Sequence, residues 1–123
     1  MSEAKTVYKL VRLKKDGNCY PLFINKTTPF KFGQWVAAEF HPTKGFAERK
    51  GYHCCYQPVA PHLKEELKTG EKRVWIECLA HHIERYERPE SQGGAWCLCQ
   101  LLYPERILTW DEVRELQTVY RSS

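Results

Sequence analysis

The sequence predicts one α+β domain built from a curved, mainly antiparallel sheet and a C-terminal amphipathic helix. Its 123 residues suit a single domain with one buried core. Its apolar and aromatic segments are short and are separated by turn residues at hairpin spacing, which favours antiparallel strands. Clear helical periodicity is confined to the C-terminal end. We therefore expect residues 1–123 to fold as one unit, with flexible ends at residues 1–5 and 121–123.

The first forty residues predict a β-hairpin followed by one ambiguous segment. "TVYKLVRLK" alternates between two sets of side chains that both contain apolar residues, as in a largely buried strand. "KDGN" is a turn sequence that favours a hairpin, and "CYPLFIN" predicts the return strand. Pro21 places that strand at a sheet edge or at a strand start. "GQWVAAEF" is compatible with either a short helix or a strand, and Pro42 ends it in both cases.

The middle of the chain predicts three further strands. "GYHCCYQ" at residues 51–57 has strand character, and "HLKEELKTG" suits one or two helical turns that end at its glycine. "KRVWIECLA" is the clearest strand because it is rich in β-branched and aromatic residues. "HIERYERPESQGG" then carries this strand into a loop, and "AWCLCQLLYPERIL" returns as another strand.

The C-terminal segment predicts a capped helix. Thr109 followed by Glu112 matches a capping box, in which each residue satisfies a backbone N–H of the other. The residues that fall near one helical face, which we expect to be anchored by its two aromatic members, are Trp110, Val113, Leu116, Gln117 and Tyr120.

Composition argues against export and against a membrane span. No apolar run approaches the roughly 18 residues that cross a bilayer, so we expect no membrane partner. The N-terminus "MSEAKTVYKL" lacks the charged-then-apolar pattern of a secretory signal. We therefore expect a cytoplasmic protein whose six cysteines are reduced and structural.

The cysteines and histidines do not predict a metal site. A structural zinc needs four converging ligands, usually with a Cys-x-x-Cys knuckle, and the sequence contains none. Cys97 and Cys99 share one face of a strand with apolar residues, as small buried side chains do. Strand alternation also separates His53 from Cys54, which argues against a cysteine nucleophile. We expect no metal, no cofactor and no catalytic residue, and we favour a protein that is not an enzyme.

The segment "HPTKGFAERKGYHCC", residues 41–55, is the first candidate site. Lys44, Arg49 and Lys50 lie beside glycines, and His53 follows on the emerging strand. Arginine offers a bidentate fork to phosphate oxygens, lysine offers a point charge, and glycines let backbone amides approach. The sequence therefore indicates a phosphate or other anion here, and a solvent-exposed charged turn is the alternative.

The segment "YERPESQGG", residues 86–94, is the second candidate site. Arg88, Ser91 and Gln92 are hydrogen-bonding side chains placed just before a glycine pair. Serine and glutamine can recognise the edge of a nucleobase, and arginine can pair or stack with it. One or two of the four tryptophans at a rim could stack a base as well. A purely structural turn is the alternative.

Several segments together resemble a family of small uncharacterised proteins of bacteriophages and mobile elements of gut bacteria. The resemblance covers residues 7–108, and its most distinctive pieces are "HPTKGFA" and "ERPESQGG". It implies the cytoplasm of a bacterial host and an action on host defence, either by sequestering a cyclic or NAD-derived nucleotide signal or by blocking a nuclease. Because the family has no established activity, the resemblance assigns no catalytic residue.

Three functional hypotheses follow. The leading one is a non-enzymatic module that binds a phosphate-bearing nucleotide or NAD-derived signal. The second is an enzyme acting on NAD or a cyclic nucleotide with His53 as acid or base, since "GYH" resembles a segment of ADP-ribosyltransferase-type domains. The third is an inhibitor of a host defence protein or a nucleic acid that uses residues 1–53, where ten Lys and Arg oppose four acidic residues. A homo-oligomer is compatible with all three.

Overall fold

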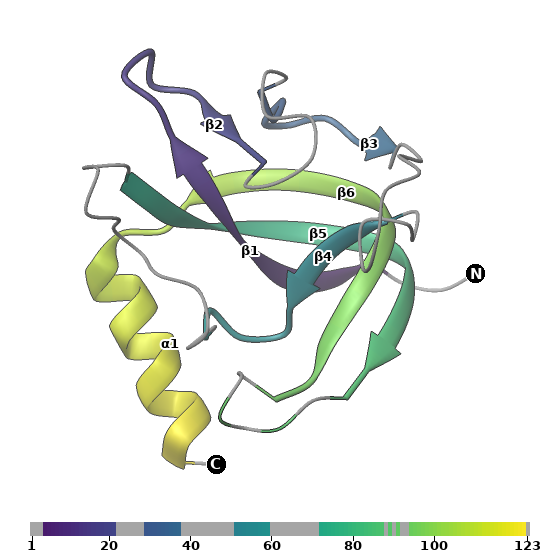
Figure 1. The fold of residues 1–123 in the computed structure, drawn as a ribbon, viewed down its shortest axis with the longest axis vertical. Coiled ribbons are helices and arrows are strands. Elements are labelled where there is room, and N and C mark those ends of the chain that lie inside the picture. The colour runs from purple at the N-terminus through teal and green to yellow at the C-terminus, as the bar shows by residue number, and fades with distance from the viewer. Residues whose placement is uncertain are drawn as a thin grey trace.

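The computed structural model contains six strands and one helix within the residues that it describes (Figure 1). The described residues are 4–21, 29–37, 51–59, 72–87, 89, 91 and 94–122. The elements are β1 (Lys5–Leu13), β2 (Cys19–Tyr20), β3 (Val36–Ala37), β4 (Tyr52–Cys55), β5 (Lys72–Tyr86), β6 (Trp96–Ile107) and α1 (Trp110–Ser122). Strands that pair only antiparallel, with a C-terminal helix, confirm the predicted α+β fold.

Four of the strands close into a small barrel. β1 pairs with β5, β5 with β6, β6 with β4, and β4 again with β1. The last of these contacts is the weakest, because the described strands pair there only at Tyr8 and Cys55. β2 pairs with β1, and β3 pairs with β6, in each case along the part of the edge that β4 does not occupy. Closure satisfies most strand edges within the chain, which a short open sheet could not do.

Both long strands bend at the same place, and the bend makes closure possible. On β5, Ala80 and Ile83 both face the barrel interior, so the two consecutive residues between them face outward. On β6, Cys99 and Leu102 both face the interior in the same way, with two residues between them. His82 lies at this point with a φ of 55°, in the left-handed region. β5 and β6 curve together on the side of the molecule away from α1 (Figure 1).

A bulge lies nearer the end of the β5–β6 ladder. The register passes from Glu77–Arg106 to Cys78–Pro104, so β6 contains one extra residue there. Proline has no N–H to donate to a ladder and is tolerated in strands at bulges. The bulge explains how β6 continues through Pro104 as the sequence predicted.

The barrel interior is filled largely by small and β-branched side chains. All six cysteines are free thiols, and all except Cys55 are buried. The main interior cluster consists of Val7, Val11, Cys19, Phe30, Cys54, Ile76, Cys78, Ala80, Cys97, Cys99 and Leu102. Small side chains suit the narrow space that four strands enclose.

Stability should fall as the pH rises above about 9, because Cys19 keeps its proton in the folded protein longer than in the unfolded chain. Burial raises the pKa of Cys19 from 9.0 to about 11. This stabilising contribution is fully present below the unfolded pKa and is lost at about 1.4 kcal/mol per pH unit until the folded thiol titrates. Urea unfolding of the wild type and of Cys19→Ala at several pH values between about 8 and about 10.5 measures it. Equal slopes for the two proteins would contradict this assignment.

Helix α1 packs against the outside of the barrel. Val113 and Leu116 contact an outer cluster that also contains Tyr8, Leu10, Cys55, Trp75 and Leu108. Gln117 Nε2 donates a hydrogen bond to the carbonyl oxygen of Pro58 at 2.8 Å. The helix therefore covers the outer side of the β1–β4 contact. The expectation that Trp110 anchors this face is wrong, because Trp110 is 38% exposed and Leu108 fills the core position at that end.

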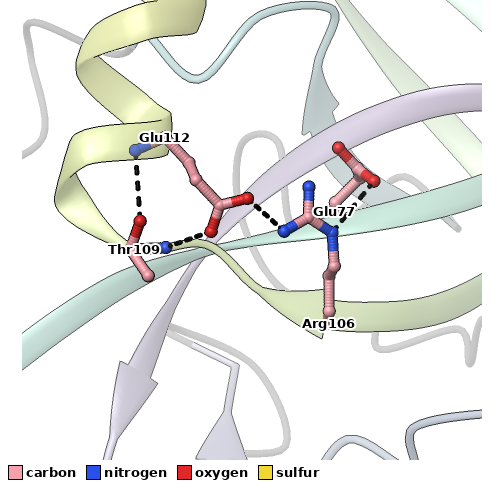
Figure 2. Close-up of polar contacts among 4 residues, drawn as sticks. All are labelled: Glu77, Arg106, Thr109 and Glu112. Carbon is pink, nitrogen blue, oxygen red and sulfur yellow. Dashed lines mark hydrogen bonds and ion pairs between the residues drawn. The ribbon is translucent and has the colours of Figure 1, made fainter.

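The predicted capping box at the start of α1 is confirmed (Figure 2). The backbone N–H of Glu112 donates to Thr109 Oγ1 at 3.1 Å, and the backbone N–H of Thr109 donates to Glu112 Oε1 at 3.0 Å. Arg106 on β6 forms ion pairs with Glu112 and with Glu77 of β5, so the cap is also tied to the barrel. The Thr109 N–H and Arg106 lower the pKa of the Glu112 carboxyl.

Replacing Thr109 by Ala should lower the free energy of unfolding by about 0.5–2 kcal/mol, because a backbone N–H of the first turn loses its acceptor. Chemical denaturation measures the change. Thr118→Ala is the matched control, since Thr118 is exposed in the same helix and its hydroxyl donates only to the carbonyl of Arg114. Alanine has the higher helix propensity, so this variant should be neutral or slightly stabilised. Equal losses in the two variants would count against a specific role for the cap.

Several expectations lie outside the described residues. These are the helical turns at residues 62–70, the later part of the strand predicted at 19–25, and residues 38–40 of the ambiguous segment, whose described end forms β3. Where the structure is described, no helix combines the length and apolar character needed to cross a bilayer.

Candidate functional site

The first candidate segment is joined to the barrel through two strands, β3 before it and β4 at its end, which lie close together. β3 and β4 lie end to end along one edge of β6, because Ala37 pairs with Leu101 and Tyr52 pairs with Cys99. The chain between them, residues 38–51, interrupts what would otherwise be one strand. The hydroxyl of Tyr52 donates to the carbonyl oxygen of Ala37 at 3.1 Å and ties the two ends together. The two chain ends that flank residues 38–50 are therefore fixed beside each other, and we call residues 38–51 the excursion.

Gly51 is required where this excursion returns to the sheet. Its φ of 145° belongs to the region that favours glycine. A Cβ atom at this position would lie 3.2 Å from Leu98 Cβ and 3.3 Å from Gln100 Nε2. A larger residue would therefore adopt an unfavourable φ and also force the side chains of Leu98 and Gln100 to shift.

Most of the predicted ligand-binding side chains lie outside the described residues. These are Lys44, Arg49, Lys50, Arg88 and Gln92. His53 is on β4 and is half-buried, while Ser91 is exposed in the segment between β5 and β6. The structure thus fixes the base of the first segment, and the roles of its cations stay predictions.

His53 has a packing environment that the sequence did not reveal. Its ring is stacked with Trp96, with centroids 5.0 Å apart and planes at 20°. Trp96 is also stacked with Tyr86, at 4.9 Å and 22°. The carbonyl oxygen of His53 accepts a hydrogen bond from Lys9 Nζ at 2.8 Å, which links β4 to β1. His53 is thus fixed in place, and its ring contributes to packing across the sheet.

The two candidate segments join the β4–β6 ladder at opposite ends. The first enters at Tyr52, which pairs with Cys99, and the second enters at Trp96, which pairs with Cys55. Three residue steps of a strand separate these points, or about 10 Å. A single ligand that contacts side chains of both segments would therefore have to span that distance, and such shared binding is a prediction.

An exposed aromatic cluster beside the excursion was not assigned from the sequence. Trp35 precedes β3 and is 44% exposed. Its ring centroid lies 5.0 Å from that of His81 on β5 and 5.4 Å from that of Tyr103 on β6, at tilts of 31° and 57°. We call Trp35, His81 and Tyr103 the aromatic platform. The sequence signal was limited to a tryptophan that follows glycine and glutamine in "FGQW".

The strained backbone of His82 lies across β6 from the two ends of the excursion. The β5–β6 register passes from His81–Leu101 to Ile83–Cys99, and the excursion opens on the other side of β6 between Leu101 and Cys99. His82 is exposed, and its φ of 55° costs conformational energy in a residue with a side chain. Strain of this kind concentrates at functional sites, which supports placing the site at this bend.

The thiols in the barrel form a packed group rather than a reactive one. The sulfur atoms of Cys97 and Cys99 are 3.6 Å apart, and Cys97 Sγ donates to the carbonyl oxygen of Cys54 at 3.6 Å. The hydrogen bond from Cys99 lowers the pKa of Cys97, whereas burial raises the pKa of Cys78. Because these thiols are buried, a substrate cannot reach them without the barrel opening. Within the described part of the chain, no three His, Cys, Asp or Glu side chains converge as a metal site would require.

Comparisons with known proteins leave the geometry as the basis for function. No protein-family model, no curated protein and no solved structure matches the chain. The resemblance to phage proteins therefore stays a prediction.

Proposed function

We propose that this protein is a non-enzymatic module that binds a phosphate-bearing nucleotide or a nucleotide-derived signalling molecule. The observation that carries the proposal is the excursion at residues 38–51, whose two ends are tied at one point on the edge of β6. We expect these fixed ends to limit how far the cations of the segment can lie from that point, which would lower the entropic cost of binding.

The residue types within the excursion support an anionic ligand. Arg49 offers two parallel N–H donors to a phosphate, and Lys44 and Lys50 offer point charges. The chain carries a net charge of +4, which favours the approach of an anion. Carriage by a phage and action on host defence belong to the same proposal and rest on the resemblance alone.

Binding is favoured over catalysis by the placement of the described reactive groups. The buried thiols are shielded from a substrate, and the face of the His53 ring is engaged by Trp96. An acid or base that serves a reaction needs a side chain within hydrogen-bond reach of the substrate. The enzyme hypothesis, with His53 in that role, therefore becomes an outcome of the test.

Replacing Arg49 by Ala should weaken nucleotide binding by about 1.5–3 kcal/mol, the range for a charge-assisted hydrogen bond, with little loss of stability. Isothermal titration calorimetry with ATP, NAD, ADP-ribose and a cyclic dinucleotide provides the measurement. Lys44→Ala should have a smaller effect, because salt screens an exposed point charge. Arg88→Ala should also weaken binding if the second segment reaches the same ligand.

Lys15→Ala is the matched control, because Lys15 is an exposed cation in the turn between β1 and β2. It should leave the affinity unchanged. If Arg49→Ala and Lys15→Ala change the nucleotide affinity equally, the excursion is only a solvated turn and does not bind the ligand. Ligand recovered intact after denaturation supports sequestration, and altered ligand supports an enzyme. Absence of binding to every nucleotide supports an inhibitor of a protein or nucleic acid.

A further inference from the structure

We infer that the aromatic platform of Trp35, His81 and Tyr103 is a stacking site for a nucleobase. The inference rests on the proposed function and deepens it, because it assigns the part of the ligand that the phosphate-binding excursion does not. It implies that the protein distinguishes a nucleotide from an inorganic phosphate compound or a sugar phosphate.

Trp35 differs from the tryptophans that build the core. Trp75 and Trp96 are 2% and 7% exposed, as large aromatic side chains in a domain usually are. Trp35 keeps 44% of its surface in solvent although two rings contact it. A large ring that is held in place but left uncovered is suited to receive another flat ring.

The members of the platform come from three different segments of the chain, two of which are strands of the sheet. His81 lies on β5, Tyr103 lies on β6, and Trp35 immediately precedes β3, which pairs with β6. Tyr103 and His81 flank Trp35 at 5.4 Å and 5.0 Å between ring centroids. A stacking surface fixed in this way loses little side-chain entropy when a ligand binds.

The platform and the excursion share one edge of the barrel. Only Val36 and Ala37 separate Trp35 from the start of the excursion at residue 38. Under the proposed function, a ligand bound close to the fixed ends of the excursion would have its remaining atoms beside the platform. Lys31 adds an exposed cation close to the platform in sequence. An anion carrying an aromatic base complements both features.

The size of the exposed apolar surface favours a base over a protein partner. Among the described residues, the exposed large apolar side chains are Phe32, Trp35, Ile107 and Trp110. Of these, only Phe32 and Trp35 lie in the segment before β3 that contributes to the platform. A stable protein interface buries roughly 800 Å² on each partner, which two such side chains do not provide. One stacked base needs only a single ring face.

The test compares probes that contain a base with probes that do not. ATP, NAD and ADP-ribose carry a base, whereas tripolyphosphate and pyrophosphate carry phosphates alone. Trp35→Ala should weaken binding of the base-containing probe by about 5–150-fold, the effect of losing one stacked base. Trp35→Phe should retain part of that affinity, because it keeps a flat ring. Binding of tripolyphosphate should be the same in the wild type and in Trp35→Ala.

Trp110→Ala is the matched control, since Trp110 is also an exposed tryptophan and lies at the start of α1. It should bind every probe as the wild type does, and thermal melting should show that all three variants fold. The inference is overturned if Trp35→Ala binds ATP, NAD and ADP-ribose as tightly as the wild type. It is also overturned if the wild type binds tripolyphosphate as tightly as ATP. If either result is obtained and Arg49→Ala still weakens binding, the inference fails and the proposed function stands. If the wild type binds none of the probes, the inference and the proposed function both fail.

Discussion

Replacing Trp75 by Ala is expected to lower the free energy of unfolding by about 3–5 kcal/mol, which is the largest single effect that the fold predicts. Trp75 lies on β5 and is almost completely buried in the cluster that joins the barrel to α1. Its neighbours include Leu10 across the β1–β5 ladder, Leu108 just before α1, and Val113 on α1. Alanine would leave a cavity that these side chains can fill only in part. Urea unfolding followed by circular dichroism measures the change.

Trp75→Phe is the control that separates ring volume from polar contacts. The indole Nε1 of Trp75 is buried and has no hydrogen-bond partner among the described residues. Phenylalanine removes this buried donor and keeps an aromatic ring, so it should lose less than half as much stability as alanine. A loss below about 1 kcal/mol for Trp75→Ala would mean that the helix is not anchored through this residue.

Replacing Gly51 by Ala should lower the free energy of unfolding by about 2–4 kcal/mol, because strain and crowding act together. The φ of 145° is unfavourable for alanine. The added methyl group would also press on Leu98, which is buried, and on Gln100. Thermal and urea unfolding provide the measurement. Nucleotide affinity should fall as well, since Gly51 closes the excursion.

Gly17→Ala separates the two causes. Gly17 has a φ of 84° in the turn between β1 and β2, and a Cβ atom there would meet nothing within 4 Å. It should therefore lose only the strain contribution, about 1–2 kcal/mol. An equal loss in both variants would show that crowding against Leu98 contributes nothing.

Local patterns in the sequence sufficed to predict most elements of the fold. Alternation identified β1, the β-branched and aromatic content identified the first half of β5, and the spacing of Thr109 and Glu112 identified the helix start. The end of β5 at Tyr86 was not predicted, because the left-handed residue His82 interrupts the alternation of inward and outward side chains. Closure of the barrel was also not predicted, since it depends on pairing between β1 and β4, which are distant in sequence.

The candidate site was predictable only in its residue types. Glycines and cations marked the excursion, but the anchoring of its two ends depends on the register of β3 and β4 along β6. The stacking of His53 with Trp96 and of Trp35 with His81 joins residues more than forty positions apart. Short sequence motifs carry no information about contacts at such separations, so the environments of these rings required the structure.

The single register pair between β1 and β4 has a consequence for the solubility of the chain. The contact is supported from inside by the hydrogen bond from Lys9 to His53 and from outside by α1, which packs on both Tyr8 and Cys55. If α1 detaches, the ring of strands can part there and expose two unsatisfied strand edges. Such edges pair readily with those of another molecule, which is how sheet proteins aggregate. The C-terminal helix therefore covers the strand edges at which the barrel would open, in addition to completing the outer cluster.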